Sequence, residues 1–226
     1  MAVTTAGGKF RNYWERVALR EQAMAIGAPC VNWQRMRGFN DVERLIWDRV
    51  KDARRILDFG SGDQALRRKF LEAGYQGRYE TFDVSPEFPT TWTDESAIDG
   101  RFDAVLCLEV IEHMPLDEGL AMRERLLSRL APGGWLIVST PNPACILSPF
   151  CRDETHLHLY PLHDLITWAL AAGLRVEARR VKLLPDRMTI KARARLLAQR
   201  VATYVVGADR ADGIMILARG NDSSPD

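Results

Sequence analysis

The ten residues 56–65, ILDFGSGDQA, decide the fold of this 226-residue chain. Apolar residues form a short strand, Gly60 and Gly62 follow as a turn, and a helical pattern starts at Gln64. Glycine has no Cβ, so a bound cofactor can lie directly against the main chain of such a turn. The stretch therefore predicts a strand, a ligand-binding turn and a helix, which together begin an open α/β sheet.

Short apolar runs and longer amphipathic runs alternate on both sides of that turn, which predicts a mostly parallel sheet with crossover helices. The predicted strands are 55–59, 78–84, 102–110, 131–140, 174–181 and 213–218, and the predicted helices are 13–24, 40–50, 64–74, 116–130, 161–173 and 190–206. We expect one domain over 51–219, with 1–50 as its N-terminal helical cap and 220–226 as a disordered tail.

Composition and charge exclude several classes of protein. The chain is 46% hydrophobic and 27% charged with a net charge of +1, so no global charge attracts it to nucleic acid or membrane. Four cysteines without a C-x-x-C pair indicate neither a disulfide scaffold nor a zinc module. The start lacks the apolar core of a signal peptide, and prolines interrupt the longest uncharged stretch. We therefore expect a cytoplasmic protein without a transmembrane segment.

Two aspartates end the first two predicted strands. Asp58 precedes the glycine turn by two residues, and Asp83 lies where an acid would reach ribose hydroxyls. An acid next to the turn does not suit the pyrophosphate of a nicotinamide cofactor. It suits S-adenosylmethionine (SAM), which has no phosphate and carries a cationic amino group and a sulfonium. The pattern favours SAM, with an NAD(P)-dependent oxidoreductase as an alternative.

A second motif, LEVIEHMP at 108–115, follows an apolar run and places Glu109, Glu112 and His113 at the carboxyl end of a strand, where open sheets bind ligands. Three interpretations are open. The glutamates could accept hydrogen bonds from loop amides while His113 packs on the cofactor. His113, together with Glu112, could act as a general base on a hydroxyl acceptor. The three side chains could also ligate Mg²⁺, Mn²⁺ or Zn²⁺ with His156 as a fourth ligand.

With these motifs the chain resembles the class I SAM-dependent methyltransferases. The resemblance rests on DFGSG, TFDV, FDAVLCLEVIEHMP and LAPGGWLIVSTPNP, and it covers about residues 54–218. It implies a Rossmann-like, mostly parallel seven-stranded sheet with an antiparallel last strand and helices on both faces. The cofactor would be held by Asp58, Gly60, Gly62, Asp83, Val84 and Glu109. Gln64 departs from the family pattern, because the third glycine of the motif belongs at that position.

Within that family the E-V-I-E-H motif is similar to the ubiquinone-biosynthesis O-methyltransferases, which act on catechol-like hydroxyls. It is more distantly similar to the small-RNA 3′-terminal ribose 2′-O-methyltransferases, in which this group and a later histidine hold a metal. That histidine aligns with His156, while the residues after it, 158–160, do not follow the RNA enzymes' pattern. The resemblance thus implies a metal site of Glu109, Glu112, His113 and His156 as one alternative.

The acceptor is the least patterned part of the sequence. Phe10, Tyr13, Trp14 and Trp33 could stack on a ring or a sugar, and basic residues outnumber acids over 175–200. We expect SAM-dependent O-methylation of a small-molecule or saccharide acceptor, which could be anionic, and no nucleic-acid partner. A metal-dependent RNA ribose methyltransferase and a cofactor-binding protein without catalysis remain alternatives. The sequence leaves the oligomeric state open.

Overall fold

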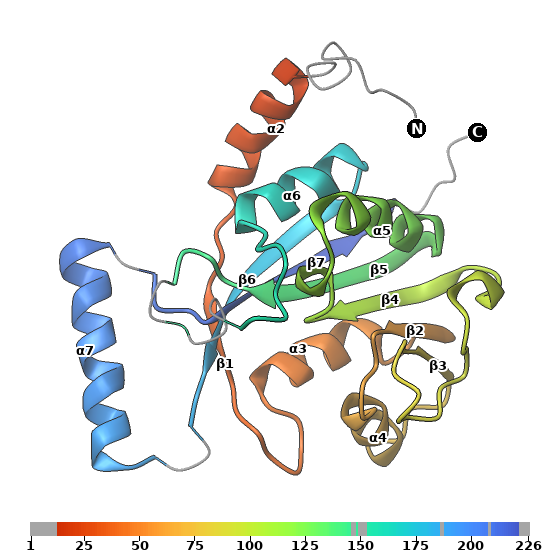
Figure 1. Ribbon diagram of the computed structural model, residues 1–226, viewed down its shortest axis with the longest axis horizontal. Coiled ribbons are helices and arrows are strands. Elements are labelled where there is room, and N and C mark those ends of the chain that lie inside the picture. The colour runs from red at the N-terminus through yellow and green to blue at the C-terminus, as the bar shows by residue number, and fades with distance from the viewer. Residues whose placement is uncertain (1–12, 146–147, 149–152, 186–187, 208, 222–226) are drawn as a thin grey trace.

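The computed structural model describes residues 13–145, 148, 153–185, 188–207 and 209–221. A single seven-stranded sheet in the order β1-β6-β7-β5-β4-β2-β3 forms the centre of the molecule (Figure 1). The strands are β1 (Cys30–Trp33), β2 (Arg55–Phe59), β3 (Arg78–Phe82), β4 (Phe102–Leu108), β5 (Leu130–Pro141), β6 (Arg175–Leu183) and β7 (Gly213–Arg219).

Helices cover both faces of this sheet. One face carries α2 (Tyr13–Ala25), α5 (Leu116–Ser128) and α6 (Leu162–Ala171), and the other carries α3 (Asp41–Val50) and α4 (Ala65–Glu72) (Figure 1). The remaining helices are the short η1 (Glu95–Ala97) and η2 (Ile111–His113) and the long α7 (Ile190–Val206). This is the predicted arrangement of a Rossmann-like α/β sheet.

The alternation of side chains along the strands builds two cores. In β4, Val105 and Cys107 pack under α5 and α6, whereas Ala104 and Leu106 pack under α3 and α4. These residues have no exposed surface, because β4 lies in the middle of the sheet with helices on either side. Burial on both faces explains why this strand is a continuous apolar run in the sequence.

The prediction of an antiparallel last strand is confirmed. β7 is antiparallel to both neighbours, β5 and β6, while β2 is parallel to β3 and β4. All carboxyl ends of the parallel strands therefore meet at one edge of the sheet, and the loops that follow them converge there.

The origin of the seventh strand differs from the expectation. The N-terminal segment, predicted as a helical cap, also contains β1, which pairs in parallel with β6 at one edge of the sheet. At the opposite edge, residues 83–101 contribute a lone bridge between Phe82 and Trp92 and the turn η1. The short β1 thus supplies the strand that brings the sheet to seven.

The predicted disordered tail is partly ordered. Gly220 donates a hydrogen bond to the Gly134 carbonyl, and the Asn221 carbonyl accepts one from Gly133. These contacts extend the pairing of β7 along β5 by two residues. Residues 222–226 lie outside the described residues.

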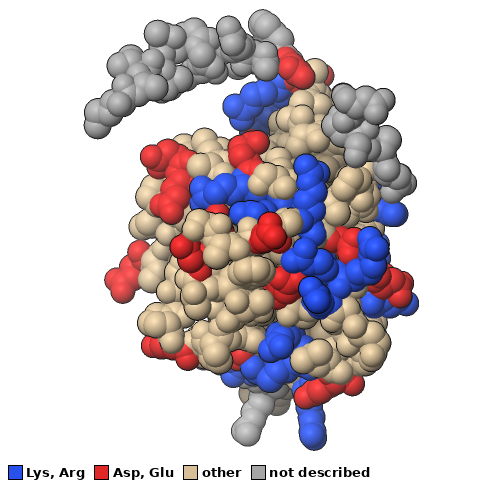
Figure 2. All heavy atoms as spheres, turned by 90° about the vertical axis from the view of Figure 1, so that its right-hand side faces the viewer, with Lys and Arg blue, Asp and Glu red and all other residues tan. Residues whose placement is uncertain are grey.

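Charge is balanced on the side of the molecule that carries the amino-terminal ends of the parallel strands. Figure 2 shows Lys and Arg side chains interleaved with Asp and Glu on this side. At the start of β2, Arg54 and Arg55 form ion pairs with Asp103 and Glu80. Among the described residues, no helix is long and apolar enough to cross a membrane.

Candidate functional site

The glycine turn after β2 is held in place by packing and by its neighbour strand. Gly60 has a φ of 77°, and a Cβ at this position would overlap the Val110 side chain. Gly62 has a φ of 47°, and an added Cβ would meet no atom within 4 Å. Gly60 is therefore required by the protein's own packing, whereas Gly62 borders open space at the carboxyl edge.

Gln64 occupies the position at which the family pattern has its third glycine, and it keeps the glycine-like backbone. Its φ of 59° is left-handed, a conformation that costs a residue with a Cβ about 1 kcal/mol or more. Its side chain offsets part of this cost, because the amide nitrogen donates to the Pro89 carbonyl and the amide oxygen accepts from Arg67. The turn thus reaches α4 through a left-handed residue that is not a glycine.

Asp83, directly after β3, holds the glycine turn in place through hydrogen bonds. One carboxylate oxygen accepts from the Gly62 amide at 2.7 Å, and the other accepts from the Ser85 amide at 2.8 Å. Each carboxylate oxygen can accept a second hydrogen bond, so ribose hydroxyls remain possible partners. The next residue, Val84, is 88% exposed and presents an apolar surface beside this carboxylate.

Asp58 is less accessible than expected. It is buried, and its carboxylate accepts a hydrogen bond from the Tyr79 hydroxyl of β3 at 2.8 Å. Burial raises the pKa of Asp58 to about 6, and the Tyr79 hydrogen bond works against that rise. The structure therefore places this acid beneath the turn, where it connects two strands.

A cavity of about 310 Å³ opens at the carboxyl ends of β4, β5 and β6, on the α3 side of the sheet. Its wall is mostly apolar, with a few carboxylates at fixed positions. The lining residues are Trp33, Val42, Glu43, Ile46, Leu66, Leu108, Glu109, Ser139, Val181, Leu183, Asp212 and Gly213. This size and polarity are typical of a small-molecule site.

Glu109 projects into this cavity from the end of β4. Its backbone is left-handed with a φ of 54°, and its carboxylate accepts a hydrogen bond from the Ser139 hydroxyl at 2.6 Å. Strained backbone of this kind often occurs at functional sites. Part of Glu109 is exposed, and desolvation of its carboxylate in the cavity, followed by the charge of Glu112, raises its pKa.

Glu112 lies on the other face. It has no exposed surface, and one carboxylate oxygen accepts from the Thr140 hydroxyl at 3.0 Å. Ser139 and Thr140 are consecutive residues of β5, so their side chains leave the sheet on opposite faces and hold the two glutamates apart. Burial raises the pKa of Glu112, and among the described residues its Oε1 has no hydrogen-bond partner.

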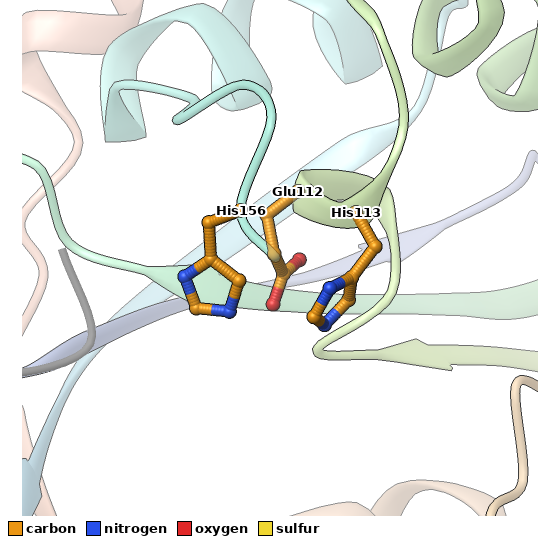
Figure 3. A group of neighbouring side chains, drawn as sticks. All are labelled: Glu112, His113 and His156. Carbon is orange, nitrogen blue, oxygen red and sulfur yellow. The ribbon is translucent and has the colours of Figure 1, made fainter. Parts of the chain in front are cut away.

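His113 and His156 lie beside Glu112. Figure 3 shows the Glu112 carboxylate between the two imidazole rings, whose centroids are 4.8 Å apart. His113 Nδ1 lies 3.1 Å from the Thr155 carbonyl. A carbonyl only accepts, so Nδ1 carries the proton and Nε2 carries the lone pair of the neutral ring.

These three residues could hold a metal ion. One potential ligand atom from each of Glu112, His113 and His156 lies within 4.8 Å of the others. Glu109 is not part of this group. Its carboxylate points into the cavity, where it accepts a hydrogen bond from the Ser139 hydroxyl. Of the four residues in the predicted metal site, the structure thus brings three together.

The methyltransferase domain family matches residues 33–179 of this chain, which is more than half of its length. The chain belongs to this methyltransferase family. The assignment confirms the expected class, a SAM-dependent methyltransferase, and favours it over a nicotinamide-dependent oxidoreductase on the same sheet.

Two curated relatives are ubiquinone biosynthesis O-methyltransferases. The protein from Bordetella avium is 28% identical over 156 residues, which cover 60% of this chain and 64% of the relative. The protein from Xanthomonas axonopodis pv. citri is 29% identical over 155 residues, which cover 54% and 63%. The chain therefore matches less than two thirds of the length of these methyltransferases.

Solved structures share the fold at low sequence identity. A SAM-dependent methyltransferase from Archaeoglobus fulgidus superposes with a TM-score of 0.61 at 16% identity, covering 95% of this chain and 99% of that one. The N-methyltransferase NodS from Bradyrhizobium japonicum, solved with S-adenosylhomocysteine, gives a TM-score of 0.51 at 17% identity and covers 78% and 84%. Both support the Rossmann-like methyltransferase fold.

Sequence reasoning missed several residues of the methyltransferase's cavity and histidine cluster. Ser139 and Thr140 were read only as part of a buried strand, and Asp212, which forms a 2.7 Å ion pair with Lys182, was not singled out. A signal existed for the first two, since hydroxyl residues at the end of an apolar strand mark its exit from the core. Trp33 lines the cavity as expected, whereas Phe10 and the side chains of Tyr13 and Trp14 lie outside the described residues.

Proposed function

We propose that the protein transfers the methyl group of SAM to a hydroxyl oxygen of a small molecule. The observation that carries this proposal is the arrangement of His113, with Nδ1 on a backbone carbonyl, Nε2 bearing the lone pair, and Glu112 beside the ring. A hydroxyl must lose its proton as it attacks the sulfonium carbon, whereas a neutral amine can attack without a base. A positioned imidazole therefore favours an oxygen acceptor.

The cofactor would lie across the carboxyl edge of the sheet. We assign its ribose to Asp83, its adenine to the exposed apolar surface of Val84, and its amino acid part to the turn Gly60–Gly62 and to Glu109. The supporting observations are the open space at Gly62, the remaining acceptor capacity of Asp83 and the position of Glu109 at the next strand end. Asp58 supports this site from below through Tyr79.

The acceptor would lie at the carboxyl edge of the sheet, with its hydroxyl directed to His113 and the rest of the molecule directed into the cavity lined by Trp33 and Glu109. Its volume suits a single ring or sugar, and its apolar wall favours a ring with few charges. The similarity to ubiquinone biosynthesis O-methyltransferases supports an aromatic hydroxyl acceptor. A saccharide hydroxyl fits the same chemistry and belongs in the acceptor screen.

Exchange of His113 tests the proposal. Transfer from isotopically labelled SAM would be measured on catechol, phenol, sugar, amine and thiol acceptors. With the best hydroxyl acceptor, His113→Ala should lower kcat by about 10² to 10⁴ and leave the affinity for S-adenosylhomocysteine nearly unchanged. His158→Ala is the matched control, because His158 lies in the segment that carries His156 but packs on Tyr160 outside the cluster.

Two outcomes would contradict this assignment. If His113→Ala weakened cofactor binding and kcat equally, His113 would be a packing residue. If amines were the only acceptors methylated, the oxygen-specific role would be lost.

A second candidate is metal-assisted methylation of a vicinal diol. It is favoured by the Oε1 of the buried Glu112, which has no hydrogen-bond partner in the part of the chain that the structure describes. Glu112, His113 and His156 fit a divalent cation in donor type, and a bound metal would orient the diol and acidify a hydroxyl. The RNA ribose alternative belongs to this candidate, and it requires affinity for 3′ RNA ends that falls steeply with salt.

Calorimetric titration with Mn²⁺ separates the two candidates. Stoichiometric binding that disappears in Glu112→Gln, but persists in the exposed-residue control Glu118→Gln, would support the metal. If the wild-type protein shows no binding, the metal candidate is rejected and the metal-free base remains.

A further inference from the structure

The helix α7 (Ile190–Val206), inserted between β6 and β7, turns an apolar face to solvent. Figure 1 shows it standing beyond the carboxyl edge of the sheet. By the 3.6-residue helical period, five large apolar or aromatic residues share this outward face. They are Ile190, Leu197, Val201, Tyr204 and Val205, and each is between 54% and 93% exposed. Such a cluster of exposed apolar side chains marks an interaction surface.

Basic side chains border that face on both sides. Lys191 and Arg195 lie along one border, where they also line a hollow between α7 and the sheet, and Arg193 and Arg200 lie along the other border; all four are exposed. The helix contains no acidic residue. Long basic side chains at the border of an apolar helix face can extend to lipid phosphates while the apolar residues enter the head-group region.

The opposite side of α7 contacts the protein. Gln199 is buried, and Leu196 and Thr203 are half-buried. The helix is well terminated, since Thr189 caps its start and Gly207 ends it in a left-handed conformation. The apolar face is therefore the side of α7 that points away from the protein.

We propose that α7 binds the surface of an anionic lipid bilayer, with its apolar face in the head-group layer and its four cations on lipid phosphates. Charge complementarity selects this occupant over a second copy of the chain. Two α7 helices packed face to face would bring two rows of four cations together without an acid from either helix. The helix has 17 residues and contains four cations, so it is not long and apolar enough to cross a membrane and would lie in the surface.

The position of α7 would place a bound bilayer close to the cavity that contains Glu109. A second hollow lies between α7 and the sheet, and it shares Trp33, Leu183 and Asp212 with the cavity that contains Glu109. A bilayer bound to α7 would thus lie next to the acceptor cavity. This consequence rests on the proposed function, whereas bilayer binding itself does not.

Vesicle sedimentation tests the proposal. The full-length protein should bind vesicles of phosphatidylglycerol and phosphatidylcholine at low salt, and bind pure phosphatidylcholine far more weakly. Arg193→Gln with Arg200→Gln should lower the partition coefficient by on the order of tenfold. Leu197→Gln with Val201→Gln should lower it by a similar factor, and glutamine preserves the helix. Arg54→Gln with Arg78→Gln removes the same charge at the other end of the sheet and should leave binding nearly intact.

Specific results would overturn the proposal. The proposal is wrong if the wild-type protein does not bind anionic vesicles. It is also wrong if the α7 variants bind these vesicles as well as the wild-type protein does. Concentration-dependent dimers that dissociate in Leu197→Gln with Val201→Gln, without vesicle binding, would assign the face to a second copy. Unchanged S-adenosylhomocysteine affinity in all variants would show that they are folded and would keep this test separate from the proposed function.

Discussion

At the scale of single residues, the glycine turn after β2 depends on two glycines for different reasons. Both have positive φ angles, but only Gly60 faces a side chain, that of Val110, at the distance of a Cβ. Val110 belongs to the segment that leads from β4 to η2. Gly60 thus packs the glycine turn against the segment that carries Glu109 and Glu112.

This difference predicts separable effects of alanine. Gly62→Ala should cost about 1 kcal/mol for the left-handed backbone, and Gly60→Ala should cost about 1 to 3 kcal/mol more because it overlaps Val110. Adding Val110→Ala to Gly60→Ala should restore part of that loss. Urea denaturation gives these values, and equal losses in the two single variants would show that the packing argument is wrong.

At the scale of elements, sequence reasoning located the sheet well because local signals agreed. The bounds of β2 and α7 are as predicted, since glycine turns and a change of hydrophobic period mark them. It missed β1, because four residues between two helices give too short a pattern to separate from a loop.

The separation of Glu109 from Glu112 was also not predictable. Their spacing in the sequence suggested one ligand set, but the side-chain alternation of Ser139 and Thr140 in another strand decides which face each occupies. Such a contact between distant segments has no local signal. For the same reason the sequence could propose His156 as a partner of His113, while its placement required the fold.

The contact between β2 and β3 through Asp58 and Tyr79 predicts a pH-dependent stability. The pKa of Asp58 is raised from 3.8 to about 6, so the folded state binds a proton more tightly than the unfolded state. The proton on Asp58 stabilises the folded protein at low pH. This stabilisation is lost as the pH rises from about 4 through about 6. It amounts to at most about 3 kcal/mol.

Asp58→Asn should remove this component, because an amide oxygen can still accept from Tyr79 but cannot titrate. The free energy of unfolding of wild type minus variant should therefore fall between pH 4 and pH 7. Asp117→Asn, at an exposed position in α5, is the control. A difference that stays constant with pH would contradict the role of Asp58.

At the scale of the whole molecule, the features that bear chemistry lie at the carboxyl edge of one sheet. The glycine turn, Asp83, Glu109, the histidine cluster and α7 all follow strand ends there. The other end of the sheet carries paired charges instead (Figure 2). The crossover topology causes this division, because parallel strands place all of their carboxyl ends together.

The most direct test of the account is a calorimetric titration with S-adenosylhomocysteine. We predict one site per chain in the wild-type protein and affinity at least tenfold weaker in Asp83→Asn, which removes the charged acceptor that we propose for the ribose hydroxyls. The control Asp117→Asn should bind like the wild type. A folded wild-type protein that binds NADH and not S-adenosylhomocysteine would contradict SAM-dependent methyl transfer.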